Sequence, residues 1–128
     1  MKTKALLITL MLLFVTTLPP VVSALALVDL DLKSSLNQQL DVRIRLLTST
    51  ADELDGVTVN VKALSQAGAG YLAIPHFQHE LIRDDTGNYL RITTRDAVRE
   101  PVISFLVEMN WAGGHLLREY SLLIDPQN

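Results

Sequence analysis

Imidazole binds transition metals and transfers protons near neutral pH, so the three histidines are the first residues to consider for chemistry. His76 and His79 lie three residues apart, and His115 lies much further along the chain. Two residues three apart lie on one face of a helix but on opposite faces of a strand. Pro75 disfavours a helix here. No cysteine is present to complete a zinc site. We therefore interpret the histidines as surface or hydrogen-bonded residues and expect no metal and no other cofactor.

Two pairs of carboxylates could bind calcium or transfer protons. Asp29 and Asp31 share one face of an expected strand, but the oxygen-rich loop and positioned glycine of an EF-hand are absent. Glu108 and Glu119 fall on neighbouring strands of an expected hairpin, as an acid/base pair would. Arg118 lies beside them, so a cross-strand ion pair explains these charges more simply.

The sequence offers no nucleophile in a known catalytic context. It has no cysteine and no serine in a G-x-S-x-G elbow, and Ser104 falls in an expected buried strand. Gly68 and Gly70 are not followed by the G-K-[ST] of a phosphate-binding loop. These features predict a protein that is not an enzyme.

Five residues near the end of the chain are candidates for partner contact: Arg99, Trp111, His115, Arg118 and Tyr120. Arginine, tryptophan and tyrosine are enriched at interface hot spots. The alternative is structural, with Trp111 and Tyr120 covering the end of a core and the charges pairing across strands. The sequence leaves both interpretations open.

These candidates belong to an expected β-hairpin that dominates the apolar pattern. Alternate residues predict one apolar face on each strand: Ile103, Phe105, Val107 and Met109 on the first, and Leu116, Tyr120, Leu122 and Ile124 on the second. The segment from Trp111 to His115 contains two glycines and is expected to turn through a positive φ. Leu106, Leu117 and Leu123 make the opposite face apolar too, which predicts central strands covered on both sides.

The preceding chain alternates in the same way, which predicts further strands at 28–33, 40–46, 57–61, 73–83 and from 90. Residues 34–39 and 84–88 read as turns. The polar connection 48–56 is expected to hold a short helical turn capped by Thr50 or Asp52. A short helix is expected over 63–71. About seven strands with one short helix predict an all-β fold, an antiparallel β-sandwich of immunoglobulin-like type without its Cys–Trp–Cys pattern.

The first 24 of the 128 residues have the pattern of a cleavable signal peptide. Lys2 and Lys4 precede an uncharged run over 5–18 and two prolines, and small residues precede an expected cleavage between Ala24 and Leu25. An uncleaved membrane anchor is the alternative, but the run is shorter than the roughly 20 residues that a spanning helix needs. We expect residues 1–24 to be removed and 25–128 to form one domain without a stable membrane anchor.

Loss of the leader changes the formal net charge from −3 to −5. Binding to phosphate backbones depends on clustered Lys and Arg, so an acidic domain of this kind is not expected to bind nucleic acid. The absence of cysteine also excludes disulfides and the lipid attachment that requires an N-terminal cysteine. Stability must therefore come from a packed core.

Two segments carry a resemblance to a known family. REPVISFLVEMNWAGGHLLREYSLLIDP over 99–126 and LDLKSSLNQQLDVRIRLL over 30–47 resemble the N-terminal periplasmic domain of FimV proteins, which act in type IV pilus assembly and twitching motility of Gram-negative bacteria. Departures are Ala26 and Val28, where relatives tend to have glycine, and Gln39, where proline is common. The family has no catalytic residues to carry over.

The resemblance implies a periplasmic domain that contacts envelope proteins of the pilus, secretin or polar-organising machinery. Relatives usually continue into a peptidoglycan-binding LysM module and a membrane helix, whereas this sequence ends at Asn128, so contact with peptidoglycan is expected only indirectly. Two alternatives remain: a small glycan- or peptidoglycan-binding β-sandwich that uses Trp111, Tyr71 or Tyr89, and a truncated paralogue without an independent role.

Overall fold

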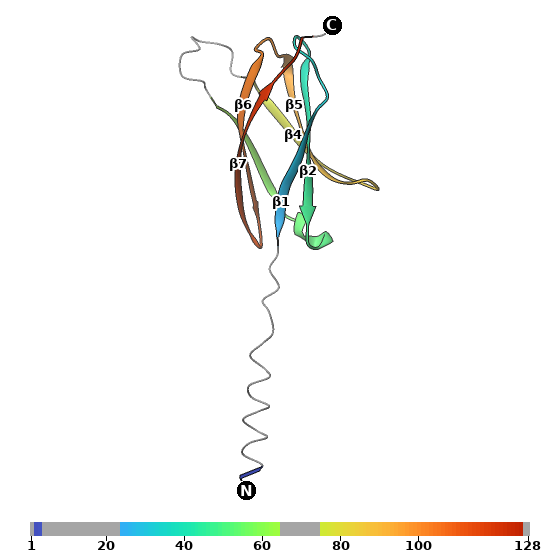
Figure 1. Ribbon diagram of the computed structural model, residues 1–128, viewed down its shortest axis with the longest axis vertical. Coiled ribbons are helices and arrows are strands. Elements are labelled where there is room, and N and C mark those ends of the chain that lie inside the picture. The colour runs from blue at the N-terminus through green and yellow to red at the C-terminus, as the bar shows by residue number, and fades with distance from the viewer. Residues whose placement is uncertain (1, 4–23, 65–74, 127–128) are drawn as a thin grey trace.

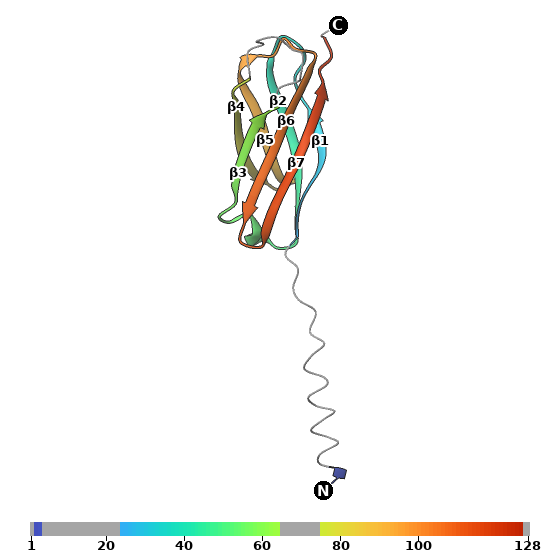
Figure 2. The same cartoon turned by 90° about the vertical axis from the view of Figure 1, so that its left-hand side faces the viewer.

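Two antiparallel sheets pack face to face in the computed structural model, which describes residues 2–3, 24–64 and 75–126 (Figures 1 and 2). The strands of this part of the chain are β1 (Leu25–Leu32), β2 (Gln39–Thr48), β3 (Thr58–Ala63), β4 (Phe77–Asp84), β5 (Gly87–Ala97), β6 (Val102–Trp111) and β7 (Gly114–Leu123). A single-turn 3-10 helix, η2 (Ala51–Leu54), follows β2. The predicted antiparallel β-sandwich of about seven strands is confirmed.

The sheets have the strand orders β1-β2-β5-β4 and β3-β6-β7, and every pair is antiparallel. The edge strand β4 lies beside β3 of the other sheet. At the other side β1 lies beside β7 (Figure 2). The sandwich therefore has two seams, one between β3 and β4 and one between β1 and β7.

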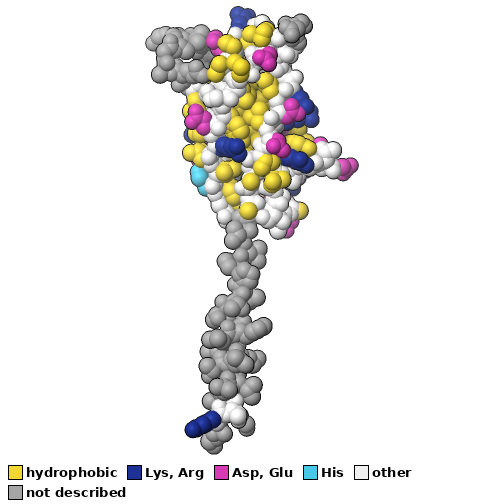
Figure 3. Space-filling view, viewed as in Figure 1, with side chains coloured by type: hydrophobic (Ala, Val, Ile, Leu, Met, Phe, Trp, Pro, Cys, Tyr) yellow, Lys and Arg dark blue, Asp and Glu magenta, His cyan; other side chains and the backbone are white. Residues whose placement is uncertain are grey.

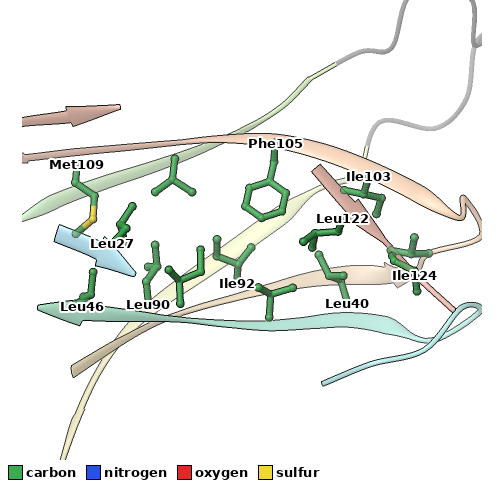
Figure 4. Close-up of a cluster of buried hydrophobic side chains, with 14 of the residues drawn as sticks. Leu27, Leu40, Leu46, Leu90, Ile92, Ile103, Phe105, Met109, Leu122 and Ile124 are labelled. Atoms are coloured by element: carbon green, nitrogen blue, oxygen red, sulfur yellow. The ribbon is translucent and has the colours of Figure 1, made fainter. Parts of the chain in front are cut away.

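The core is built from alternate residues of the central strands, as the period-two pattern predicts (Figure 4). Phe105, Val107 and Met109 of β6 are fully buried. They face Val42 and Ile44 of β2 and their neighbours on β5, which are equally inaccessible. Burying a side chain of this size stabilises a fold by about 1.5–3 kcal/mol. The predicted inner face of the final hairpin is confirmed.

The prediction that both hairpin strands are covered on both faces is wrong. Strand β6 is central in its sheet, but β7 is an edge strand. Leu117 is 54% exposed and Leu123 is 69% exposed, because they point away from the core. Ser104, expected to be buried, also points outward, and its hydroxyl lies 2.8 Å from that of Ser121 on β7. Only one face of this sheet is packed.

The helical expectations are partly right. Residues 65–71 of the helix expected over 63–71 lie outside the described residues, and Ala63, its expected start, is the last residue of β3. The expected helical turn in 48–56 is η2. Thr50 occupies its N-cap position but makes no side-chain cap hydrogen bond. Instead, the backbone N–H of Ser49 donates to Glu53 Oε2 at 2.6 Å.

The turn predicted at 84–88 is confirmed and joins β4 to β5. The carboxylate of Asp84 accepts hydrogen bonds from the backbone N–H of Thr86 at 2.8 Å and from its hydroxyl at 2.5 Å. Gly87 follows with a φ of +137°, a conformation that favours glycine. Local side-chain bonds thus fix this turn without help from the core.

On the outer face of the four-stranded sheet, Arg91 of β5 binds Asp41 of β2 through two hydrogen bonds of 3.0 and 2.8 Å. This guanidinium holds the pKa of Asp41 below its ordinary value of 3.8. Because the pKa of Asp41 is lower in the folded chain than in the unfolded chain, the ion pair stabilises the fold at pH values above the unfolded-state pKa. This stabilisation is lost as the pH falls through the folded-state pKa.

We expect Asp41→Asn to lower the free energy of unfolding at pH 7 by up to about 1 kcal/mol, because the pair is partly exposed. The difference should disappear as the pH falls below 3.8. Urea unfolding followed by circular dichroism at several pH values measures it. Asp85→Asn, in the exposed β4–β5 turn, is the control and should change neither the free energy of unfolding at pH 7 nor its dependence on pH. A difference that persists at the lowest pH would contradict the ion-pair explanation.

Candidate interaction surface

The turn between β6 and β7 is shaped by the indole of Trp111. Trp111 and Gly114 pair directly across this turn. A Cβ on Gly114 would lie 3.1 Å from Trp111 Cζ2, so only glycine lets the ring lie this close. Positive φ values occur among the described glycines at Gly56 and Gly87, and not in this turn. The predicted glycine turn is confirmed, but its expected conformational reason is wrong.

Trp111 also lines a shallow pocket at this end of the sandwich. The pocket has a volume of about 200 Å³ and is lined by Thr50, Asp52, Glu53, Asp55, Trp111, Ala112 and Gly113. The indole N–H of Trp111 is buried and has no hydrogen-bond partner within the described residues. The ring therefore covers the end of the core beside η2, as the structural interpretation of Trp111 expects.

Arg118 occupies an inward-facing position of β7 and closes the seam to β1. Its guanidinium donates a hydrogen bond to the backbone oxygen of Leu27. That oxygen lies next to the register shift between Leu27 and Leu30 on β1. Figure 3, seen from the same direction as Figure 1, shows hydrophobic side chains gathered along the middle of the face on which β7 and β1 lie. Arg118 thus places a charge and a hydrogen bond at an otherwise apolar seam.

The expected ion pair of Arg118 with Glu108 or Glu119 is not found in the described structure. The described ion pair of Glu108 is with Lys62 of β3, at an N–O distance of 3.9 Å. The reason is the period of the strand: even-numbered residues of β7 face inward, so Arg118 lies on the opposite face from both glutamates. This alternation could have been read from the sequence.

Tyr120 lies next to Arg118 on the inner face of β7. The Arg118 guanidinium lies 5.3 Å from the centre of its ring, and the ring stacks on Phe105 with centroids 5.5 Å apart. Burial raises the pKa of the Tyr120 phenol above its ordinary value of 10.0, and the nearby Arg118 charge opposes this. The phenol oxygen is buried without a hydrogen-bond partner in the described residues. Tyr120 is a partly buried residue that packs against the core.

The remaining two candidates lie at opposite ends of the sandwich. His115 is exposed at the turn end of β7, and its Nδ1 lies 2.5 Å from Asn110 Oδ1. Arg99 is exposed in the connection between β5 and β6. Strand β6 separates the two ends by roughly 30 Å, at about 3.4 Å per residue. The five predicted contact residues therefore do not form one site.

Trp111 and Tyr89, two of the three residues considered for glycan binding, do not form one platform. Trp111 belongs to the three-stranded sheet and Tyr89 to the outer face of the four-stranded sheet. The Tyr89 hydroxyl lies 3.2 Å from that of Thr86, in the β4–β5 turn. Tyr71 lies outside the described residues. No observation thus favours the glycan interpretation.

In residues 2–3, 24–64 and 75–126, no three His, Asp or Glu side chains converge in a way that could hold a metal ion. Within the same ranges, no helix has the length and apolar character needed to span a membrane.

The feature that the sequence analysis missed is an exposed apolar surface on the three-stranded sheet. Val102 of β6 is paired with Leu123 of β7, and both are exposed on the outer face. Leu117 lies further along the same face. Its signal in the sequence is the second apolar set of the hairpin, to which Leu117 and Leu123 belong, and this set predicts a buried face where the structure has an exposed one.

Residues 25–127 match the FimV N-terminal domain, described as an Ig-like domain. The chain belongs to the FimV N-terminal domain family. The match includes all seven strands and confirms the predicted immunoglobulin-like class. No significant match to a solved structure was found.

Two relatives carry the name Motility hub protein FimV, from Pseudomonas aeruginosa PAO1 and from the strain UCBPP-PA14. Each is 35% identical to this FimV N-terminal domain over 108 residues. The matched stretch covers 80% of this chain but 12% of each relative. The chain therefore spans only a small part of the length of these two relatives.

We expect Gly114→Ala to destabilise the domain by about 1–3 kcal/mol, because the added methyl group overpacks the Trp111 ring. Trp111 is the single tryptophan of the chain, so its emission reports the displacement directly. Gly56→Ala is the control: its φ of +74° makes alanine unfavourable, but nothing lies within 4 Å. The control should lose about 1–2 kcal/mol without a change in tryptophan emission. Equal emission changes in both variants would contradict the close packing.

We expect Tyr120→Phe to leave the free energy of unfolding at pH 7 unchanged or to raise it by up to about 1 kcal/mol, since it removes a buried hydroxyl without a partner. Above pH 10 the variant should be the more stable protein, because the phenol ionises more readily in the unfolded chain. Tyr120→Ala should cost about 3 kcal/mol or more through the cavity left beside Phe105. Chemical unfolding at pH 7 and pH 10.5 tests this, and a loss for Tyr120→Phe at pH 7 would contradict it.

Proposed function

We propose that this protein is a non-catalytic, periplasmic protein-interaction domain that acts in type IV pilus or secretin assembly, or in the polar organisation of the envelope. The observation that carries the proposal is the family match over residues 25–127. The relatives' description as motility hub proteins supports a role in bringing other proteins together.

The arrangement of side chains supports binding through surfaces rather than chemistry. Trp111, Arg118 and Tyr120 are engaged in packing at the end and the seam of the sandwich. The exposed side chains are spread over strand faces and turns. Partner recognition by a β-sandwich of this kind uses sheet faces, sheet edges and end loops.

Export with cleavage between Ala24 and Leu25 is part of the proposal. Strand β1 begins at Leu25, and the family match begins at residue 25. Removal of residues 1–24 would therefore leave every strand intact. The charge and proline pattern of the leader supports the same cleavage site.

A photo-crosslinking experiment in cells tests the proposal. Replacing exposed His115 with a photoreactive phenylalanine places a probe at the turn end of β7 without altering the core. Irradiation should link the full-length protein to a pilus, secretin or other envelope protein, identified by mass spectrometry. Loss of the gene should also reduce surface motility, and restoring the intact gene should recover it.

The same probe at Leu47 is the matched control, because Leu47 is 51% exposed on the outer face of the other sheet. If neither position links to an envelope protein and deletion leaves motility unchanged, the proposed function is wrong. A link that forms equally at both positions would indicate nonspecific collision and would also count against it.

A further inference from the structure

Strand β7 presents an unpaired edge within the described structure. It is ten residues long and pairs with β6 on one side only. At its other edge the described contact with β1 is the Arg118 side chain, which turns inward to the oxygen of Leu27. Alternate residues of an edge strand leave their N–H and C=O groups free to pair with another strand. Among the described residues, the backbone of this edge is therefore unpaired along β7, whereas just beyond the strand the oxygen of Asp125 accepts a hydrogen bond of 2.9 Å from the N–H of Leu36.

The outward side chains of β7 determine which strand could pair favourably with that edge. In order from the turn they are His115, Leu117, Glu119, Ser121 and Leu123, followed by Asp125 just beyond the strand. Leu117 and Leu123 are among the most exposed large hydrophobic residues of the described structure. They stand six residues apart, with Ser121 and Glu119 between them.

This spacing is complementary to itself. In an antiparallel pair, residues directly opposite each other project from the same face. When two β7 strands pair around a two-fold axis at Tyr120, each Leu117 lies opposite Leu123 of the second copy. Glu119 then lies opposite Ser121. Both exposed leucines gain an apolar neighbour, and no like charges meet.

We propose that β7 pairs with β7 of a second copy of this chain in that register, joining two three-stranded sheets into one of six strands. An axis at Glu119 would place the two Glu119 carboxylates opposite each other. An axis at Arg118 would place Leu117 opposite Glu119, and an axis at Ser121 would place Leu123 opposite Glu119. Each neighbouring register thus loses the apolar pairing or opposes like charges.

The inner side chains of β7 are already engaged within the same chain. Arg118 is held against Leu27 and the Tyr120 ring, and Tyr120 is stacked on Phe105. A contact through one strand lies at the small end of interface sizes, below roughly 1,200 Å². We therefore expect a weak dimer that needs a high local concentration or a chemical trap for detection.

The chain has no cysteine, so single-cysteine variants give a direct test of the register. Full-length Leu117→Cys and Leu123→Cys proteins are purified, mixed in equal amounts and oxidised with copper phenanthroline. Directly opposite residues have Cα atoms about 4.5–5.5 Å apart, within the range of a disulfide. The mixture should form a disulfide-linked dimer between the two variants, with a 117–123 link by mass spectrometry.

Each variant oxidised alone should stay monomeric. In the proposed register, residue 117 of one copy lies about 20 Å from residue 117 of the other, and the same holds for residue 123. Leu47→Cys is the matched control, since Leu47 has similar exposure on the other sheet. Its mixture with Leu123→Cys should not crosslink. Melting temperatures of all variants should equal that of the unsubstituted chain, because these side chains are exposed.

Efficient dimers of Leu117→Cys alone, without a 117–123 link in the mixture, would overturn the register. Failure of every mixture to crosslink, with a monomer in sedimentation velocity at high concentration, would overturn self-pairing itself. The proposal goes beyond the proposed envelope function, and its test uses the purified chain alone. Failure here therefore leaves the crosslinking test in cells unaffected.

Discussion

The burial of one face of β6 against β2 and β5 is the interaction on which the rest of the structure depends. Phe105, Val107 and Met109 are completely inaccessible, as are Val42 and Ile44 across the core. No disulfide supplements this packing, because the chain has no cysteine. The ladder of β6 with β3 and β7 then places the outer strands. Every surface available for binding is held in position by this core.

A sandwich of two open sheets must also close its seams, and an arginine acts at each one here. Arg118 of β7 reaches the backbone oxygen of Leu27 on β1. Arg83 of β4 donates to Asp55, which lies before β3, at 2.9 Å. A charged side chain at an edge both satisfies local hydrogen bonds and discourages unselective strand pairing. Arg118 points inward and does not cover the outer face of β7, so Leu117 and Leu123 remain exposed there.

This arrangement explains why the candidate contact residues have different roles. Trp111 and Tyr120 are aromatic residues of the type found at hot spots, but they pack against Gly114 and Phe105. His115 and the leucines of β7 remain accessible on the edge of the sheet. In this member of the FimV N-terminal domain family, the aromatic candidates thus belong to the packing, and the accessible side chains on the outer face of β7 include His115, Leu117 and Leu123.

The sequence by itself determined the strands, the inner face of the hairpin and the turn at Asp84, because these depend on alternation and on local hydrogen bonds. Only the tertiary structure decided which strands lie at an edge, since strand order depends on pairing between distant segments. That pairing exposes Leu117 and Leu123 and directs Arg118 to Leu27 instead of to a glutamate. Alternation shows that a residue faces outward, but not whether anything covers that face.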